Sequence, residues 1–289
     1  MTNPKNASSQ LEVWVFMIVT FGWSWGIASY AYFSGTGYGA LLALCYMMGP
    51  AVGALTCALR YDRHRFFESL GLSTNPFNKW LFVAFLAPIF LVAISHLITQ
   101  NFSGRSILSL ADAYTVEFNK VGIDPESLPI SIEKIAWLQL ITAPFLAALL
   151  NTFVMILTEE VGWRGWLWDR WAQMPFWKHA IFVGIIWGVW HAPIILMGHN
   201  YPDMPIWGAI IFIAMVMLLT PIIAHIREAG GSMIHAAMFH GVFNGVAPFT
   251  IIIMADSSMP WRGVLGISGF IVLILGALLV TAHRSIQPT

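Results

Sequence analysis

Long runs of apolar residues, separated by short polar segments, follow one another along almost the whole chain. Eight of these runs are long enough, at roughly 20 residues each, to cross the hydrocarbon core of a bilayer as α-helices. The pattern predicts an all-α, polytopic membrane helix bundle that forms a single integral membrane domain over residues 1–289. The spans are expected at about 13–33, 39–59, 80–98, 135–158, 179–197, 205–226, 231–254 and 263–282.

Composition and charge agree with a membrane protein. Hydrophobic residues make up 58% of the 289 residues and charged residues only 10%, whereas soluble domains carry about 25% charged residues. The formal net charge is zero, so nothing indicates a nucleic-acid partner. The partner that the composition predicts is the lipid bilayer itself.

The basic residues are distributed unevenly over the polar segments, and this sets the expected orientation. If the N-terminus is cytoplasmic, ten of the fourteen Lys and Arg residues lie on the cytoplasmic side, so the positive-inside rule places both termini in the cytoplasm. The longest polar segment, residues 99–134, is then outside, with a short amphipathic helix near 107–118. The four basic residues expected outside are Arg105, Lys120, Lys134 and Arg262.

A first polar group, Glu159, Glu160 and Arg164, ends the fourth predicted span. Residues four apart share a face of a helix, so Glu160 and Arg164 are natural partners. Glu159 lies about 100° away and can face a cavity. Ionisable residues within a membrane span favour a functional site; the alternative is an interfacial ion pair at a helix end.

A second group, Trp187 and His191, lies in the fifth predicted span. A histidine there is either functional or a simple interhelical hydrogen-bonding residue. For His191 to meet Glu159, the fourth helix must continue past Glu160 toward Arg164, around a water-filled cavity open to the cytoplasm.

A third group, His240 and Asn244, lies in the seventh predicted span. The spacing of four places both side chains on one face of a helix. Both can donate hydrogen bonds, which suits a developing oxyanion. His235 lies about 140° around the helix from His240, so we expect it to face elsewhere.

In this order the three groups resemble the motifs of the CPBP family of intramembrane proteases, also called the ABI or CAAX-protease-like family, which includes type-2 CAAX prenyl endoproteases. The family pattern is EExxxR, then an aromatic residue followed at four by His, then HxxxN or HxxxD. The resemblance covers roughly residues 135–254, a family-like catalytic core, and departs from the pattern at Trp187, where Phe is usual. The corresponding residues are Glu159, Glu160, Arg164, Trp187, His191, His240 and Asn244.

The resemblance implies an endopeptidase that hydrolyses a peptide bond in a membrane-associated protein or peptide. Glu159 would act with His191 to activate a water molecule, and His240 with Asn244 would stabilise the tetrahedral oxyanion. Glu160 and Arg164 would orient the helix and the general base. Trp187 is a further supporting residue, whose larger ring could narrow the cavity and shift substrate preference.

Several alternatives remain open. No cofactor is expected, but Glu159, His191 and His240 could form a two-His, one-carboxylate zinc site, so a zinc-dependent version of the same hydrolysis is the first alternative. A non-catalytic immunity or chaperone-like membrane protein is an alternative of another class, although every catalytic position is occupied. A transporter with a proton relay is disfavoured because the sequence shows no internal repeat.

The expected location is a bacterial plasma membrane, where a peptide or membrane-protein substrate is favoured over a prenylated one.

Overall fold

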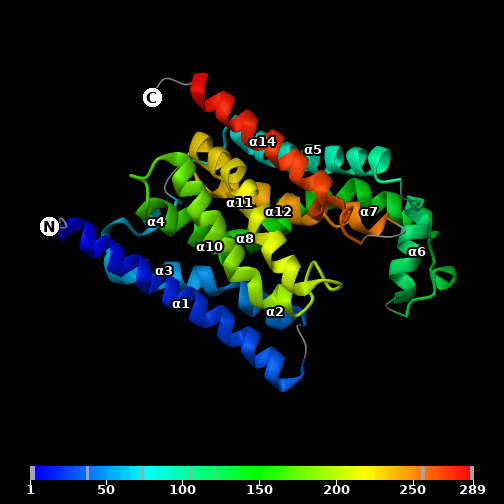
Figure 1. The fold of residues 1–289 in the computed structure, drawn as a ribbon, viewed down its shortest axis with the longest axis horizontal. Coiled ribbons are helices and arrows are strands. Elements are labelled where there is room, and N and C mark those ends of the chain that lie inside the picture. Colours follow the sequence, from blue (N-terminus) through cyan, green and yellow to red (C-terminus); the bar gives the residue numbers. More distant parts are fainter. Residues whose placement is uncertain are drawn as a thin grey trace. The chain divides into compact units, whose positions relative to one another are not determined.

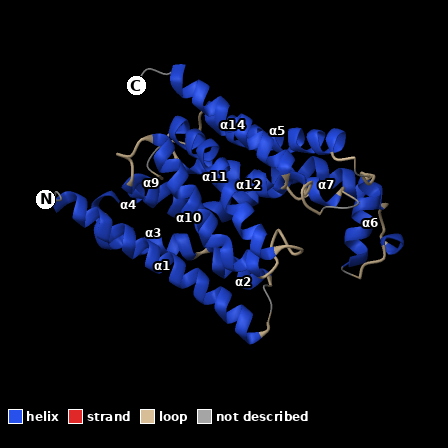
Figure 2. Ribbon diagram, viewed as in Figure 1, coloured by secondary structure: helices blue, strands red, loops and turns tan. Residues whose placement is uncertain are grey.

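The computed structural model describes residues 4–36, 39–72, 75–104, 106–120, 122–254 and 258–286, with side chains described from residue 10 onward. Arg105, which entered the charge argument, therefore lies outside the described residues. Helices dominate, and the described residues contain no strand (Figure 2). An isolated antiparallel bridge joins Ile107 to Met254. The predicted all-α class is confirmed.

The α-helices follow the apolar runs of the sequence (Figure 1). Between Ile132 and Arg170, two π-helical segments, η3 and η4, alternate with three α-helices in one unbroken helical run. The bounds are α1 Pro4–Ser34, α2 Ala40–Met47, α3 Gly49–Tyr61, α4 Phe66–Ser69, α5 Lys79–Phe102, α6 Leu110–Lys120, α7 Ile132–Leu146, η3 Ala147–Asn151, α8 Thr152–Met155, η4 Ile156–Trp166, α9 Leu167–Arg170, α10 Phe176–Leu196, α11 Pro205–Gly230, α12 Met233–Val246, α13 Phe249–Ile252 and α14 Ile267–Ile286. Short 3₁₀ turns lie at Arg63–Arg65, Pro125–Ser127 and Gly263–Leu265.

Seven helical segments among the described residues are long and apolar enough to cross a membrane, and each overlaps a predicted span. The polytopic membrane bundle is therefore confirmed. The seventh predicted span, 231–254, is instead divided into α12 and α13. Pro248 separates them, because a proline disfavours helix at the residue before it. The 14 residues of α12 rise only about 21 Å, less than the roughly 30 Å of a hydrocarbon core.

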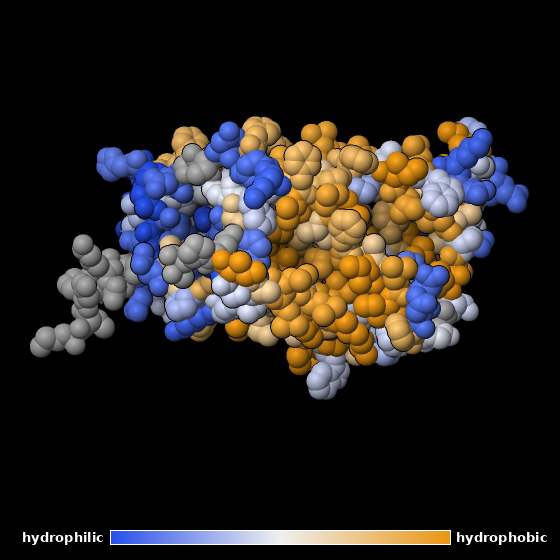
Figure 3. Space-filling model, turned by 90° about the horizontal axis from the view of Figure 1, so that it is seen from above, coloured by the Kyte–Doolittle hydropathy of each residue, from blue (hydrophilic) through white to orange (hydrophobic). Residues whose placement is uncertain are grey.

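The lipid-facing character of these helices is visible on the surface. Hydrophobic side chains cover much of the face shown in Figure 3. Ile18, Leu149 and Leu279 are each about 70% exposed, at 69%, 71% and 71%. Such exposure of large aliphatic side chains is expected where the solvent is lipid.

The chain forms two compact units. Unit 1 consists of residues 1–82 and 153–237, and unit 2 of residues 83–152 and 238–289. Within unit 1, α10 and α11 pack with their backbones in close contact, because a Cβ atom at Gly184 or Gly188 would lie 2.7 Å from a Cα atom of Met217 or Ile213. Small residues permit such approach between membrane helices.

Unit 2 is held by contacts among α5, η3, α12 and α14. Ser268 of α14 lies 3.2 Å from the hydroxyl of Ser95 and 2.7 Å from that of Thr99, both on α5. The α12 backbone packs against the end of η3, where Asn151 Nδ2 donates to the Gly241 carbonyl at 3.2 Å. The predicted amphipathic helix near 107–118 is present as α6.

Candidate active site

The Glu159–Arg164 segment lies within the π-helix η4, deep inside unit 1. Every residue from Thr158 to Trp166 is buried. π-Helical geometry, with its i to i+5 hydrogen bonds, is rare and is often found at functional sites. Here it accompanies a close approach between backbones, since a Cβ atom at Gly162 would lie 2.6 Å from the Pro50 carbonyl oxygen of α3. The helix continues past Glu160, as the sequence predicted.

Glu160 and Arg164 form a fully buried ion pair. Arg164 Nη1 donates to Glu160 Oε1 at 2.8 Å, and neither side chain is exposed. Arg164 Nη2 also lies 3.3 Å from the Thr220 hydroxyl of α11. The spacing of four residues had indicated this ion pair. The contact between Arg164 and Thr220 joins η4 to α11.

Trp187 of α10 contacts Glu159 and Arg164 of the first motif. Its indole Nε1–H donates to Glu159 Oε2 at 2.8 Å. The face of the same ring lies 4.3 Å from the Arg164 guanidinium carbon, within the range of a cation–π contact. The side chain is 2% exposed. The sequence indicated a supporting role for Trp187, but it did not predict the hydrogen bond to Glu159.

His191 is oriented one turn further along α10. Its Nδ1 lies 2.8 Å from the Trp187 carbonyl oxygen. A carbonyl oxygen only accepts, so Nδ1 carries the proton in the neutral ring and Nε2 keeps a lone pair. Phe212 of α11 and Trp190 flank the ring, with centroid distances of 4.8 and 4.6 Å. Unit 1 therefore brings the second motif together with the first.

His240 and Asn244 lie in the part of α12 that belongs to unit 2. Their spacing places both side chains on one face of this helix. His240 is 4% exposed, and Asn244 is exposed. His235 lies in the part of α12 that belongs to unit 1, where its Nδ1 donates to the Ser232 carbonyl at 3.1 Å, a structural role. That His240 and Asn244 share one cavity with Glu159 and His191 stays a prediction.

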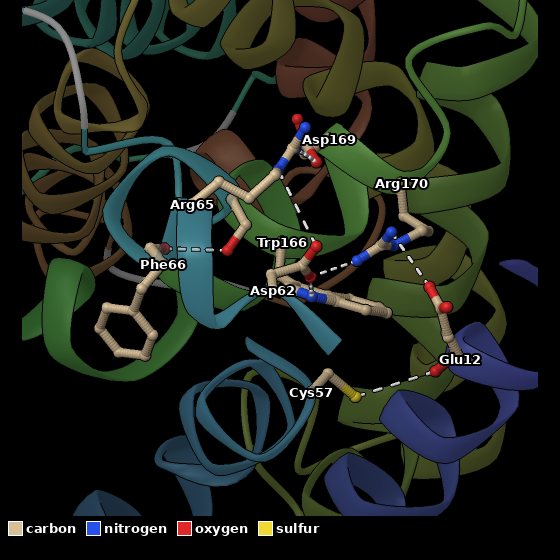
Figure 4. A network of polar contacts seen from close by, with 9 residues as sticks. Glu12, Cys57, Asp62, Arg65, Phe66, Trp166, Asp169 and Arg170 are labelled. Carbon is tan, nitrogen blue, oxygen red and sulfur yellow. Dashed lines mark hydrogen bonds and ion pairs between the residues drawn. The ribbon is translucent and has the colours of Figure 1, made fainter. Parts of the chain in front are cut away.

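A polar network that the sequence did not predict surrounds the end of the helical run Ile132–Arg170 (Figure 4). Asp62 accepts a hydrogen bond from Trp166 Nε1 at 3.0 Å and pairs with Arg170. Arg170 Nη1 also pairs with Glu12 of α1 at 3.0 Å. These charges lie at the ends of three different spans, so no sequence spacing could have linked them.

No group of three or more His, Cys, Asp or Glu side chains that could hold a metal ion is found among the described residues. Glu159 and His191 belong to unit 1 and His240 to unit 2, so the zinc site that these three residues could form stays an untested alternative. The His191 ring has the arrangement usual for a metal-binding histidine, in which one nitrogen donates to a backbone carbonyl.

Comparison with known proteins singles out the middle of the chain. Residues 141–246 match the family model described as type II CAAX prenyl endopeptidase Rce1-like. Over 106 residues, the chain is 31% identical to CAAX prenyl protease 2 from Methanococcus maripaludis. The aligned region covers 35% of this chain and 37% of that protein. The chain thus matches little more than a third of the relative's length. The matched range of the family model contains every residue of the three motifs.

Proposed function

We propose that the protein is an intramembrane endopeptidase, because residues 141–246 match the family model described as type II CAAX prenyl endopeptidase Rce1-like. It hydrolyses a peptide bond in a membrane-associated protein or peptide. The observation that carries this proposal is the cluster in unit 1. A buried carboxylate, Glu159, and an oriented imidazole, His191, are both fixed by hydrogen bonds to the same residue, Trp187.

Glu159 and His191 activate the attacking water in the proposed mechanism. The Glu159 carboxylate accepts a proton from water while the water oxygen attacks the carbonyl carbon of the scissile bond. His191, with its lone pair on Nε2, holds the water by a second hydrogen bond. When the tetrahedral intermediate collapses, the C–N bond breaks and the proton passes to the leaving amine.

His240 and Asn244 stabilise the oxyanion of the tetrahedral intermediate. A histidine N–H and an amide N–H are both suitable donors to this charge. Their placement on one face of α12 supports a shared target. Glu160 and Arg164 act indirectly, because their ion pair fixes the helix that carries Glu159.

The proposed location is a bacterial plasma membrane, with the active-site cavity facing the cytoplasm. The proposed substrate is a peptide or a membrane-protein segment. The relative's name mentions a prenylated CAAX sequence, so a farnesylated CAAX peptide belongs among the candidate substrates.

Peptide cleavage by the purified protein tests this function. The full chain in detergent is incubated with quenched fluorescent peptides, including one CAAX peptide with and without a farnesyl group. Wild type is expected to cleave at least one peptide, and Glu159→Ala and His191→Ala are expected to lose that activity. A Glu159→Ala variant that cleaves as fast as wild type contradicts the proposal. Capture of a partner protein equally by wild type and both variants, without cleavage, favours the immunity or chaperone-like role.

We propose that no metal is required. The alternative is a zinc ion held by Glu159, His191 and His240, which would act as a Lewis acid on the attacking water. The same cleavage assay with a strong chelator separates the two. Unchanged activity supports the metal-free mechanism, and activity that is lost and then restored by added zinc supports the alternative.

A further inference from the structure

Trp187 makes contacts to three of the groups in the proposed site. Its indole N–H donates to Glu159 Oε2 at 2.8 Å, its ring face lies 4.3 Å from the Arg164 guanidinium carbon, and its carbonyl oxygen accepts from His191 Nδ1 at 2.8 Å. The first two contacts depend on the side chain, and the third depends only on the backbone. A substitution at Trp187 therefore removes the side-chain contacts and keeps the backbone carbonyl that accepts from His191.

The indole N–H is a chemically specific contact. Indole only donates a hydrogen bond, and a bond to an ionised carboxylate is stronger than one between neutral groups. By fixing Oε2 it also fixes the plane of the carboxylate, and so the direction of the other oxygen, Oε1. The Arg164 guanidinium on the ring face holds the indole in place.

We infer that Trp187 is a positioning residue, whose indole N–H orients the Glu159 carboxylate for proton abstraction from water. This inference rests on the proposed function. A phenylalanine at this position keeps the aromatic face toward Arg164 and loses the hydrogen bond. Trp187→Phe therefore leaves substrate binding intact and slows the chemical step.

The chain offers a matched control in Trp163. Trp163 lies in η4, is fully buried, and packs its ring against Phe16 and Trp190. Among the described residues, its Nε1 has no hydrogen-bond partner. Trp163→Phe thus removes the same atoms from the interior of unit 1 without removing a hydrogen bond.

The kinetic test compares kcat and KM of wild type, Trp187→Phe, Trp163→Phe and Glu159→Ala on one cleaved peptide. Relative to the Trp163→Phe control, Trp187→Phe is expected to lower kcat about tenfold with KM unchanged, the effect of losing one hydrogen bond to a charged group. Equal kcat in the two Phe variants, with Glu159→Ala inactive, overturns the inference but leaves the proposed function standing. Cleavage by Glu159→Ala contradicts the proposed function instead.

Thermal unfolding in detergent tests the same contact without relying on activity. Trp187→Phe is expected to lower Tm more in the wild-type chain than in Glu159→Ala, where the acceptor is already missing. Trp163→Phe is expected to lower Tm equally in both backgrounds. If the Tm loss from Trp187→Phe is the same in both backgrounds, Trp187 does not hold Glu159 and the inference fails.

Discussion

Replacing Glu160 by Gln removes the charge that neutralises Arg164 while keeping the size of the side chain. Both side chains are fully buried and their nearest nitrogen and oxygen atoms lie 2.8 Å apart. At an effective dielectric constant of about 20, unit charges about 3 Å apart attract by roughly 5 kcal/mol. Thr220 and the face of Trp187, which also contact the guanidinium, are neutral, and Glu159 adds a weaker electrostatic attraction than Glu160. Because Glu160→Gln removes the larger of the two attractions to a fully buried charge, we expect it to lower the free energy of unfolding by about 3–5 kcal/mol.

Titration of the protein with SDS in mixed micelles, followed by circular dichroism, measures this loss. Asp169→Asn is the matched control, because its pair with Arg65 is partly exposed, at 27% and 43%, and is expected to contribute about 1 kcal/mol or less. A double variant with Met at Glu160 and Arg164 should recover part of the loss, since it removes both charges of the pair but also the attraction between Arg164 and Glu159. If Glu160→Gln and Asp169→Asn cost the same, the ion pair does not stabilise η4 and the reasoning is wrong.

Three further predictions follow from single contacts. Gly162→Ala places a Cβ atom against α3 and should lower the free energy of unfolding by about 1–3 kcal/mol, whereas Gly26→Ala, with nothing within 4 Å, should not lower it in the same SDS titration. Asn244→Ala removes a proposed oxyanion donor and should lower kcat about 10²–10³-fold without lowering Tm; unchanged kcat would contradict that role. Asp62→Asn weakens the pairing of Arg170 and should destabilise the chain by about 1–3 kcal/mol, measured by thermal unfolding.

The hydropathy of the sequence predicts most of the membrane-spanning helices. The fifth predicted span, 179–197, differs from α10 by only three residues at one end and one at the other. The pattern misled at 231–254, because the hydropathy of an apolar run does not show that the helix is divided at Pro248. The orientation of the termini depends on charges alone and stays a prediction.

The site was predictable in its residues but only partly in its contacts. A spacing of four was enough to pair Glu160 with Arg164. The π-helix η4 was not predictable, because it occurs where Gly162 packs against α3, a tertiary contact. The hydrogen bond from Trp187 to Glu159 joins residues 28 positions apart, and no periodicity links them. Its only signal in the sequence was the departure from the family's usual Phe.

A double-mutant cycle between Glu159 and His191 tests the central claim most directly. Rates of peptide hydrolysis are measured for wild type, Glu159→Gln, His191→Ala and the double variant, each first shown to unfold at the wild-type temperature. Residues that act as one unit on a single water are strongly non-additive, so the double variant is expected to be no slower than the slower single variant. Losses that multiply, or a Glu159→Gln variant with wild-type activity, would contradict the account.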